Sequence, residues 1–82
     1  MKLKEIRQLR GFSQNTLAKA LGVNPSNIIK YESGVNSLDG AKLISLLKIC
    51  NTLDCRLEDL LSDPETLEQM RIYNERCFKN EG

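Results

Sequence analysis

Three glycines divide the first 34 residues of the chain into segments that are long enough only for short helices. Gly11, Gly22 and Gly34 stand 11 and 12 positions apart, and glycine readily adopts the positive φ at which many helices end. Asn24 and Pro25 follow the second glycine, and they are respectively a preferred helix cap and a preferred first helical residue. The sequence therefore predicts a series of brief helices joined by tight turns.

Apolar residues recur at helical spacing within these segments, and no stretch shows the alternation of a strand. In the first three predicted helices, of which Ser13 caps the second, the inward positions are Leu3, Ile6, Leu9, Leu17, Ala18, Leu21, Ile28 and Tyr31. A fourth helix is predicted from about Gly40 to Leu53, capped by Asp39, with apolar positions at Leu43, Leu46, Leu47, Cys50 and Leu53.

Two further helices complete the prediction. Residues 56–61 form a short fifth helix, and the run Asp63, Pro64, Glu65 begins a sixth that extends to about Lys79. We therefore expect an all-α fold, with a compact bundle of five short helices in residues 1–62 and a C-terminal helix in residues 63–82.

The second and third predicted helices form a helix-turn-helix unit. Gly22 permits the turn, Ala18 is small enough for a close crossing, and Val23 and Ile28 are expected to fill the wedge between the two helices. One face of the third helix then points outward, and its residues are Pro25, Ser26, Asn27, Ile29 and Lys30. An exposed helix of this kind fits the major groove of DNA.

The spacing of these residues resembles the Cro and phage-repressor type of helix-turn-helix domain, the XRE family, over residues 3–61. The residues that support the resemblance are Arg7, Ser13, Gln14, Leu17, Ala18, Leu21, Gly22, Val23, Ile28, Glu32, Gly34, Leu53, Leu57 and Leu60. The resemblance implies a lambda-repressor-like bundle and a sequence-specific, double-stranded DNA-binding transcription regulator. We favour a repressor, but an activator fits equally, because occupancy of DNA does not set the sign of regulation. The resemblance further implies that residues 24–32 enter the major groove, and it does not imply an enzyme.

The resemblance also implies roles for individual residues. A glutamine at the position of Gln14 touches the DNA backbone and braces the start of the recognition helix, and the pair Arg7 and Glu32 forms an internal ion bridge. Pro25 and Ser26 stand where base-contacting side chains begin, although proline offers only apolar contact, for example with a thymine methyl group.

The remaining candidates for DNA contact follow from side-chain chemistry. Asn27 and Lys30 are suited to polar contact with base edges, and Ile29 either meets a thymine methyl group or packs within the protein. Three residues that flank the third helix either reach phosphates or form turns, and they are Asn24, Ser33 and Asn36.

Charge is distributed unevenly along the chain. Residues 1–36 contain six Lys and Arg against two Glu, whereas residues 37–82 contain six Lys and Arg against nine Asp and Glu. This asymmetry fits either a basic face for a polyanion or chance clustering on a solvated surface. Four lysines either add attraction to the DNA backbone or only solvate the surface, and they are Lys2, Lys4, Lys19 and Lys42.

The loop from Val35 through Gly40 is two or three residues longer than the resemblance predicts.

The C-terminal helix has an apolar stripe that needs a partner surface. Its residues are Leu67, Met70, Tyr73, Cys77 and Phe78. The stripe docks on its own domain or pairs with a second chain, and we favour a homodimer that binds a palindromic site. Two alternatives stay open, namely the DNA-binding antitoxin of a toxin–antitoxin pair, whose tail would bind a partner protein, and an interaction module that has lost DNA binding.

Three cysteines and no histidine limit the chemistry that the chain can perform. A structural zinc site needs four such ligands, and catalysis by a thiol needs a base partner, so we expect no metal, no cofactor and no enzyme activity. No apolar run approaches the ~20 residues that cross a bilayer, and the first residues do not resemble a signal peptide. We therefore expect no membrane association, reduced thiols and a cytoplasmic location.

Overall fold

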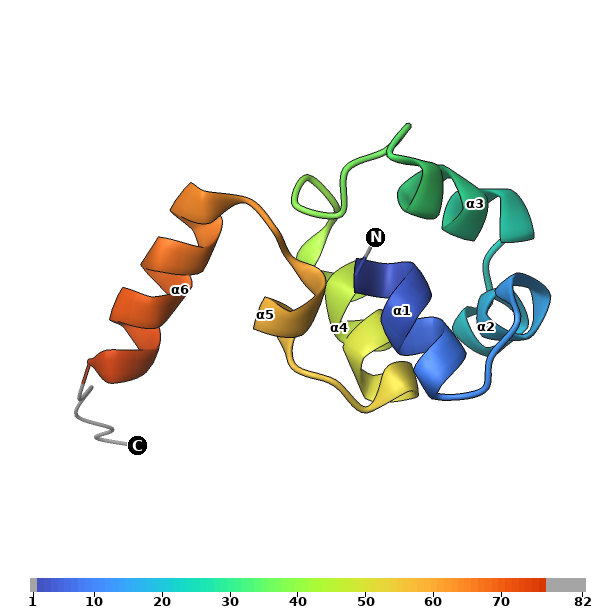
Figure 1. Ribbon diagram of the computed structural model, residues 1–82, viewed down its shortest axis with the longest axis horizontal. Coiled ribbons are helices and arrows are strands. Elements are labelled where there is room, and N and C mark those ends of the chain that lie inside the picture. Colours follow the sequence, from blue (N-terminus) through green and yellow to red (C-terminus); the bar gives the residue numbers. More distant parts are fainter. Residues whose placement is uncertain (1, 77–82) are drawn as a thin grey trace.

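In the computed structural model, residues 2–76 are described, and they form six helices with no strand among them. The helices are α1 (Lys2–Leu9), α2 (Gln14–Leu21), α3 (Pro25–Ser33), α4 (Leu43–Leu53), α5 (Leu57–Leu60) and α6 (Pro64–Glu75). The first five gather into a bundle, and α6 stands at one side of it, next to α5 (Figure 1). The predicted all-α bundle with an added C-terminal helix is confirmed.

One hydrophobic core joins the five bundle helices. In this core α2 packs on α3 and α4, α1 packs on α3 and α5, and α4 packs on α5. The buried residues are Leu3, Leu17, Ala18, Ile28, Leu38, Leu46, Ile49, Cys50, Leu53, Leu60 and Leu61. Every bundle helix therefore contributes at least one buried side chain to this shared core.

The segment between α3 and α4 is longer than expected, because α4 begins at Leu43 rather than near Gly40. Two turn bonds, from Gly40 N to Ser37 O and from Ala41 N to Leu38 O, hold this segment outside the helix, and Leu38 is buried. The prediction that Asp39 caps the fourth helix is wrong. Its Oδ1 instead accepts hydrogen bonds from the backbone N–H groups of Ser62 and Asp63, at 3.2 and 3.1 Å.

The inward face of α4 is rotated relative to the prediction. Leu46 and Cys50 are buried as expected, but Ile49 is buried where Leu47 was expected, and Leu43 and Leu47 are exposed. The four buried positions, 46, 49, 50 and 53, follow the spacing of a single helical face. Leu43 and Leu47 therefore lie beyond the edge of this face, on the outside of the bundle. Leu9 of α1 was also expected to point inward, and it too is exposed.

The two described cysteines behave as core groups. Cys50 is buried and Cys55 is half-buried, and neither forms a disulfide. Burial, together with the neighbouring Cys55, raises the pKa of the Cys50 thiol to about 12. A thiol with so high a pKa is a poor nucleophile at neutral pH, which agrees with its interpretation as a small apolar group. Cys77 lies outside the described residues.

The start of α6 matches the sequence prediction, whereas its end falls earlier. Asp63 caps the helix, because its Oδ2 accepts from Thr66 N at 2.9 Å and from Thr66 Oγ1 at 2.8 Å, with Pro64 in the first turn. The helix ends at Glu75, whereas the predicted end was Lys79. Lys79 lies outside the described residues, as do the stripe residues Cys77 and Phe78.

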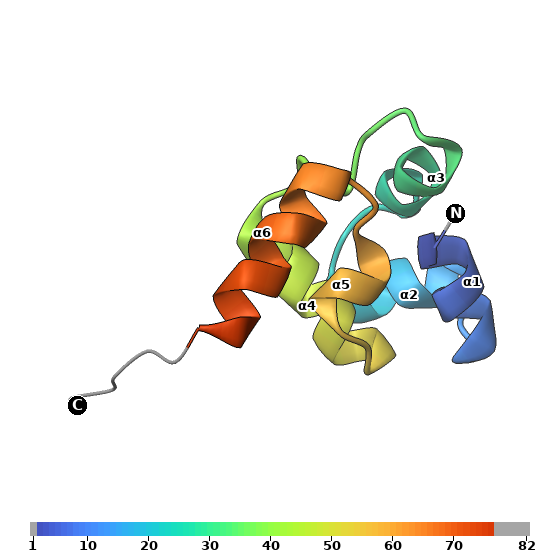
Figure 2. The same ribbon diagram turned by 60° about the vertical axis from the view of Figure 1, so that its left-hand side comes forward.

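Contact between α6 and the bundle is slight. No residue of α6 is buried. Leu67 and Met70 are half-buried against the core of the same chain, and Asn74 Nδ2 donates to Glu58 Oε2 at 3.4 Å. In Figure 2, which brings this side of the molecule forward, α6 runs along the outside of the bundle.

Candidate nucleic-acid interface

The crossing of α2 and α3 is built from a capping box, a small residue and a glycine turn. Ser13 Oγ accepts from Thr16 N at 3.0 Å, and Thr16 Oγ1 accepts from Ser13 N at 2.8 Å, so two free donors at the start of α2 are satisfied. The helix ends at Gly22 with φ +71°, and Val23 N donates back to Ala18 O at 3.0 Å. A Cβ at Gly22 would meet nothing within 4 Å. Glycine is therefore favoured here because it adopts a positive φ, and not because a side chain would clash.

The ends of α3 are closed by local hydrogen bonds. Asn24 Oδ1 accepts from Ser26 N at 3.0 Å, with Pro25 at the first helical position. Gly34 ends the helix with φ +85°. Ile28 is buried and fills the space under the helix, but Val23 is exposed, so the prediction that both residues fill the wedge is wrong for Val23.

The side chains predicted to lie on the outer surface of α3 are exposed, except that Pro25 is half-buried. The exposed candidates are Asn24, Ser26, Asn27, Ile29, Lys30, Ser33 and Asn36. Pro25 is half-buried, because it begins the helix next to the turn. The structure therefore brings seven of the nine candidate residues onto or beside the exposed face of one helix, while Gln14 lies at the start of α2.

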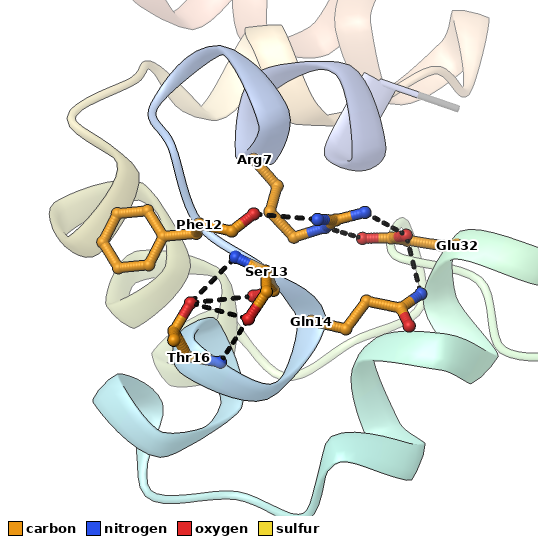
Figure 3. A network of polar contacts seen from close by, with 6 residues as sticks. All are labelled: Arg7, Phe12, Ser13, Gln14, Thr16 and Glu32. Atoms are coloured by element: carbon orange, nitrogen blue, oxygen red, sulfur yellow. Dashed lines mark hydrogen bonds and ion pairs between the residues drawn. The ribbon is translucent and has the colours of Figure 1, made fainter.

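A buried polar network fixes the inner side of α3 (Figure 3). Arg7 Nε donates to Glu32 Oε2 at 2.6 Å, and Arg7 Nη2 donates to Glu32 Oε1 at 3.1 Å. A third donor of Arg7, Nη1, bonds the carbonyl oxygen of Phe12 at 2.8 Å. The two charged side chains are only 8% and 5% exposed. This predicted ion pair thus joins α1 to the last turn of α3.

The pKa of Glu32 results from opposing effects. Burial raises the pKa of its carboxyl group, but hydrogen bonds from Arg7 and Gln14, together with the charge of Arg7, outweigh the burial and leave the pKa below its ordinary value of 4.5. The network therefore keeps Glu32 ionised at neutral pH inside the protein.

Gln14 belongs to the same network. Its Nε2 donates to Glu32 Oε1 at 3.1 Å, so Gln14 ties the first residue of α2 to the last turn of α3. This bond reaches the end of α3, whereas the resemblance implied a brace at its start. The side-chain amide nitrogen of glutamine carries two N–H groups. The bond to Glu32 uses one of them, so the other can donate to a second acceptor.

Part of the basic charge in residues 1–36 has an internal role. Lys2 Nζ donates to Leu61 O at 2.9 Å, and Arg10 donates to the carbonyl oxygens of Leu53 and Asp54 at 2.8 and 3.1 Å. With Arg7, three of the six basic side chains thus bind acceptors of the protein itself. The other three are exposed, and they are Lys4, Lys19 and Lys30.

Val35, in the segment after α3, is a residue near the candidate surface that the sequence patterns did not indicate. Asn36 N donates to Lys30 O at 3.1 Å, which folds the chain back against the helix, and Val35 is left strongly exposed beside it. An aliphatic residue in a loop gives no sequence signal for such a position. Ser33 Oγ donates to the same carbonyl at 3.2 Å, so its hydroxyl forms part of the helix end.

Two short helices that cross through a glycine turn, the second exposed along one face and anchored by a buried ion pair, define a helix-turn-helix protein. The helix-turn-helix family HTH_3 matches residues 3–60, and the chain belongs to this family. The family makes the chain a DNA-binding transcription regulator of the XRE type.

Comparison with solved structures gives a similar protein. The restriction-modification controller protein C.AhdI of Aeromonas hydrophila superposes with a TM-score of 0.64 and 32% sequence identity, over 73% of this chain and 86% of that chain. A comparison with curated protein sequences finds no match. Among the helices of residues 2–76, none has the length and apolar character that crossing a membrane requires.

Proposed function

We propose that the chain is a repressor that binds a palindromic operator as a homodimer and inserts α3 into the major groove. The observation that supports this proposal is the division of α3 into two sides. Ile28 and Glu32 hold the inner side in the protein, while Asn27 and Lys30 leave the outer side at the surface. A helix that is fixed on one side and free on the other can present side chains to base edges at constant geometry.

The chemistry of each candidate suggests what it contacts. Ser26, Asn27 and Lys30 offer donors or acceptors to base edges, whereas Pro25 and the half-exposed Ile29 offer apolar contact to thymine methyl groups.

Phosphate contact needs a donor that the protein does not already use. The amide nitrogens of Gln14 and Asn24 and the side chain of Asn36 fit this requirement. Ser33 fits it less well, because its hydroxyl proton is donated to Lys30 O.

The biological setting is proposed from the structural relative. A likeness of 32% identity to a restriction-modification controller protein favours a controlling role for this chain as well. We therefore propose that the protein binds DNA upstream of its own gene. Footprinting on that DNA would reveal a protected two-fold symmetric sequence with half-sites about one helical turn apart.

A pair of charge-matched variants tests the proposed contact surface. Lys30→Ala removes one positive charge from the outer side of α3, and Arg56→Ala removes one from the exposed start of α5. Lys30→Ala should lower the affinity for the operator and relax sequence preference, by about 1–3 kcal/mol of discrimination at one base pair. Arg56→Ala should leave both unchanged in competition binding with mutated operators. Equal behaviour of the two variants would contradict the insertion of α3.

Gln14→Ala tests contact with the DNA backbone. Its removal should weaken binding to all duplexes alike, with no change in sequence preference, because phosphates carry no sequence information. The affinity of the wild type should fall with salt by about 0.9 logarithmic units per phosphate contact and per decade of salt. Full affinity and preference in both Lys30→Ala and Gln14→Ala would show that the surface is assigned wrongly.

A further inference from the structure

The outer side of α4 is an apolar surface that nothing in the described part of the chain covers. Leu43 and Ile44 are 62% and 58% exposed, and Leu47 is also exposed, so three large aliphatic side chains lie within two turns of one helix. We call these three residues the α4 patch. Single exposed aliphatic residues are ordinary on a protein surface, but a contiguous group of this kind marks an interaction site.

Charge limits what can cover the α4 patch. Lys42 and Lys48 flank it, both exposed, and residues 40–53 contain no acidic residue. Two α4 patches placed face to face would bring these lysines together, and like charges across an interface are unfavourable. A complementary surface must therefore be apolar at its centre and acidic at its edge.

A hollow along α6 has this composition. It is open and is lined by Asp63, Glu65, Thr66, Gln69, Met70 and Tyr73, of which Met70 also packs against the core of its own chain. Tyr73 is 65% exposed and Met70 is half-buried, so the hollow has an apolar and aromatic part. Asp63 and Glu65 supply negative charge at its other end. Aromatic residues and methionine are enriched in protein interfaces.

We infer that two copies of this chain associate by seating the α4 patch of each copy in the α6 hollow of the other. A two-fold axis makes this contact form twice. The α4 patch of the first copy meets the α6 hollow of the second, and the α4 patch of the second copy meets the α6 hollow of the first. The inference rests on the homodimer of the proposed function and specifies its interface. It also gives α6 a role beyond its slight contact with its own bundle.

Solution mass of the full chain, measured by light scattering without DNA, tests this arrangement. The wild type should have the mass of two chains. Ile44→Glu places a charge in the α4 patch, and Tyr73→Glu places one in the α6 hollow, so each variant alone should have the mass of one chain. Leu9→Glu is the control, because Leu9 is an even more exposed aliphatic residue on α1, and this variant should remain a dimer. Circular dichroism should show the same helicity in all four proteins.

Mixing the two interface variants separates this arrangement from other dimers. A mixed pair of Ile44→Glu and Tyr73→Glu retains one intact contact, because the first copy keeps its α6 hollow and the second keeps its α4 patch. An equimolar mixture should therefore recover a population with the mass of two chains. If the mixture remained monomeric while the wild type was a dimer, or if the wild type itself was monomeric, the arrangement would be wrong.

The same proteins in an electrophoretic shift distinguish this inference from the DNA-binding function. A monomeric wild type that still shifts operator DNA overturns the interface and leaves DNA binding intact. A dimeric wild type that shifts no duplex at low salt overturns the proposed function and leaves the interface intact.

Discussion

The helices α3 and α6 both lie at the surface, yet the protein holds them in different ways. Ile28 buries the centre of α3, and Glu32 connects its last turn to Arg7 and Gln14 on two other helices. No residue of α6 is buried, and its contacts with the bundle include two half-buried side chains and one long hydrogen bond.

The difference agrees with the two roles proposed for these helices, contact with DNA for α3 and contact with a second copy for α6. Contact with base edges requires constant geometry, so a helix that enters a groove must be fixed before DNA arrives. A helix that forms an interface between copies gains its remaining contacts on association, so slight attachment in one chain is enough.

Removal of the buried cation should be the most damaging change. Arg7→Ala leaves the carboxylate of Glu32 buried without its main partner, and such a loss typically costs about 3–5 kcal/mol of unfolding free energy. Arg71→Ala removes an arginine that bridges Glu68 and Glu75 on the exposed side of α6, and it should change stability little. Urea unfolding followed by circular dichroism measures both. Similar losses in the two variants would remove the contrast between the helices.

The turn before α3 should be the next most sensitive position. Gly22→Ala forces an L side chain into φ +71°, which costs about 1–2 kcal/mol although the space for the Cβ is open. Thermal unfolding should show a lower midpoint for this variant. Gly40→Ala is the control, because Gly40 does not have a positive φ and its Cβ would meet only an ordinary contact.

Hydrogen exchange should separate the two helices within one molecule. Amides of α6 are expected to exchange at least about tenfold faster than amides in the middle of α3, because few buried contacts oppose the opening of α6. The measurement is made on dilute protein and again on concentrated protein. Protection that rises in α6 with concentration would support its place in an interface, whereas equal protection of both helices in dilute protein would contradict the comparison.

The smallest effect is expected from acid. The pKa of Glu32 is lower in the folded protein than its ordinary 4.5, so the stability that its ionised form contributes is present above about pH 4.5 and is lost as the pH falls through the folded value. Glu32→Gln lacks this charge at every pH. The difference in unfolding free energy between wild type and Glu32→Gln should therefore shrink from pH 7 to pH 3. A constant difference would mean that the charge of Glu32 does not stabilise the fold.

The outer side of α3 could be predicted from sequence because local rules define it. Gly22, Asn24 and Gly34 set the ends of the helix, and Ile28 sets its inner side, so the exposed positions follow from helical periodicity. The same rules predicted the start of α6 at Asp63.

The errors arose where a distant residue competes with a local preference. Asp39 was predicted to cap a helix that follows it directly, but its carboxylate binds the backbone of Ser62 and Asp63, 23 and 24 positions away. Leu47 and Ile49 both fit an apolar helix, and only packing against the bundle decides that Ile49 is the buried one. Neither outcome has a signal in the nearby sequence.

The sequence alone determined the glycine turns at Gly22 and Gly34 and the helical periodicity, because these depend on residues within one or two turns of each other. The tertiary structure decided which faces were buried and that Gln14 binds the last turn of α3. It also decided that three basic side chains bind acceptors of the protein itself. These outcomes depend on the distances between helices, which are set only when the whole core packs.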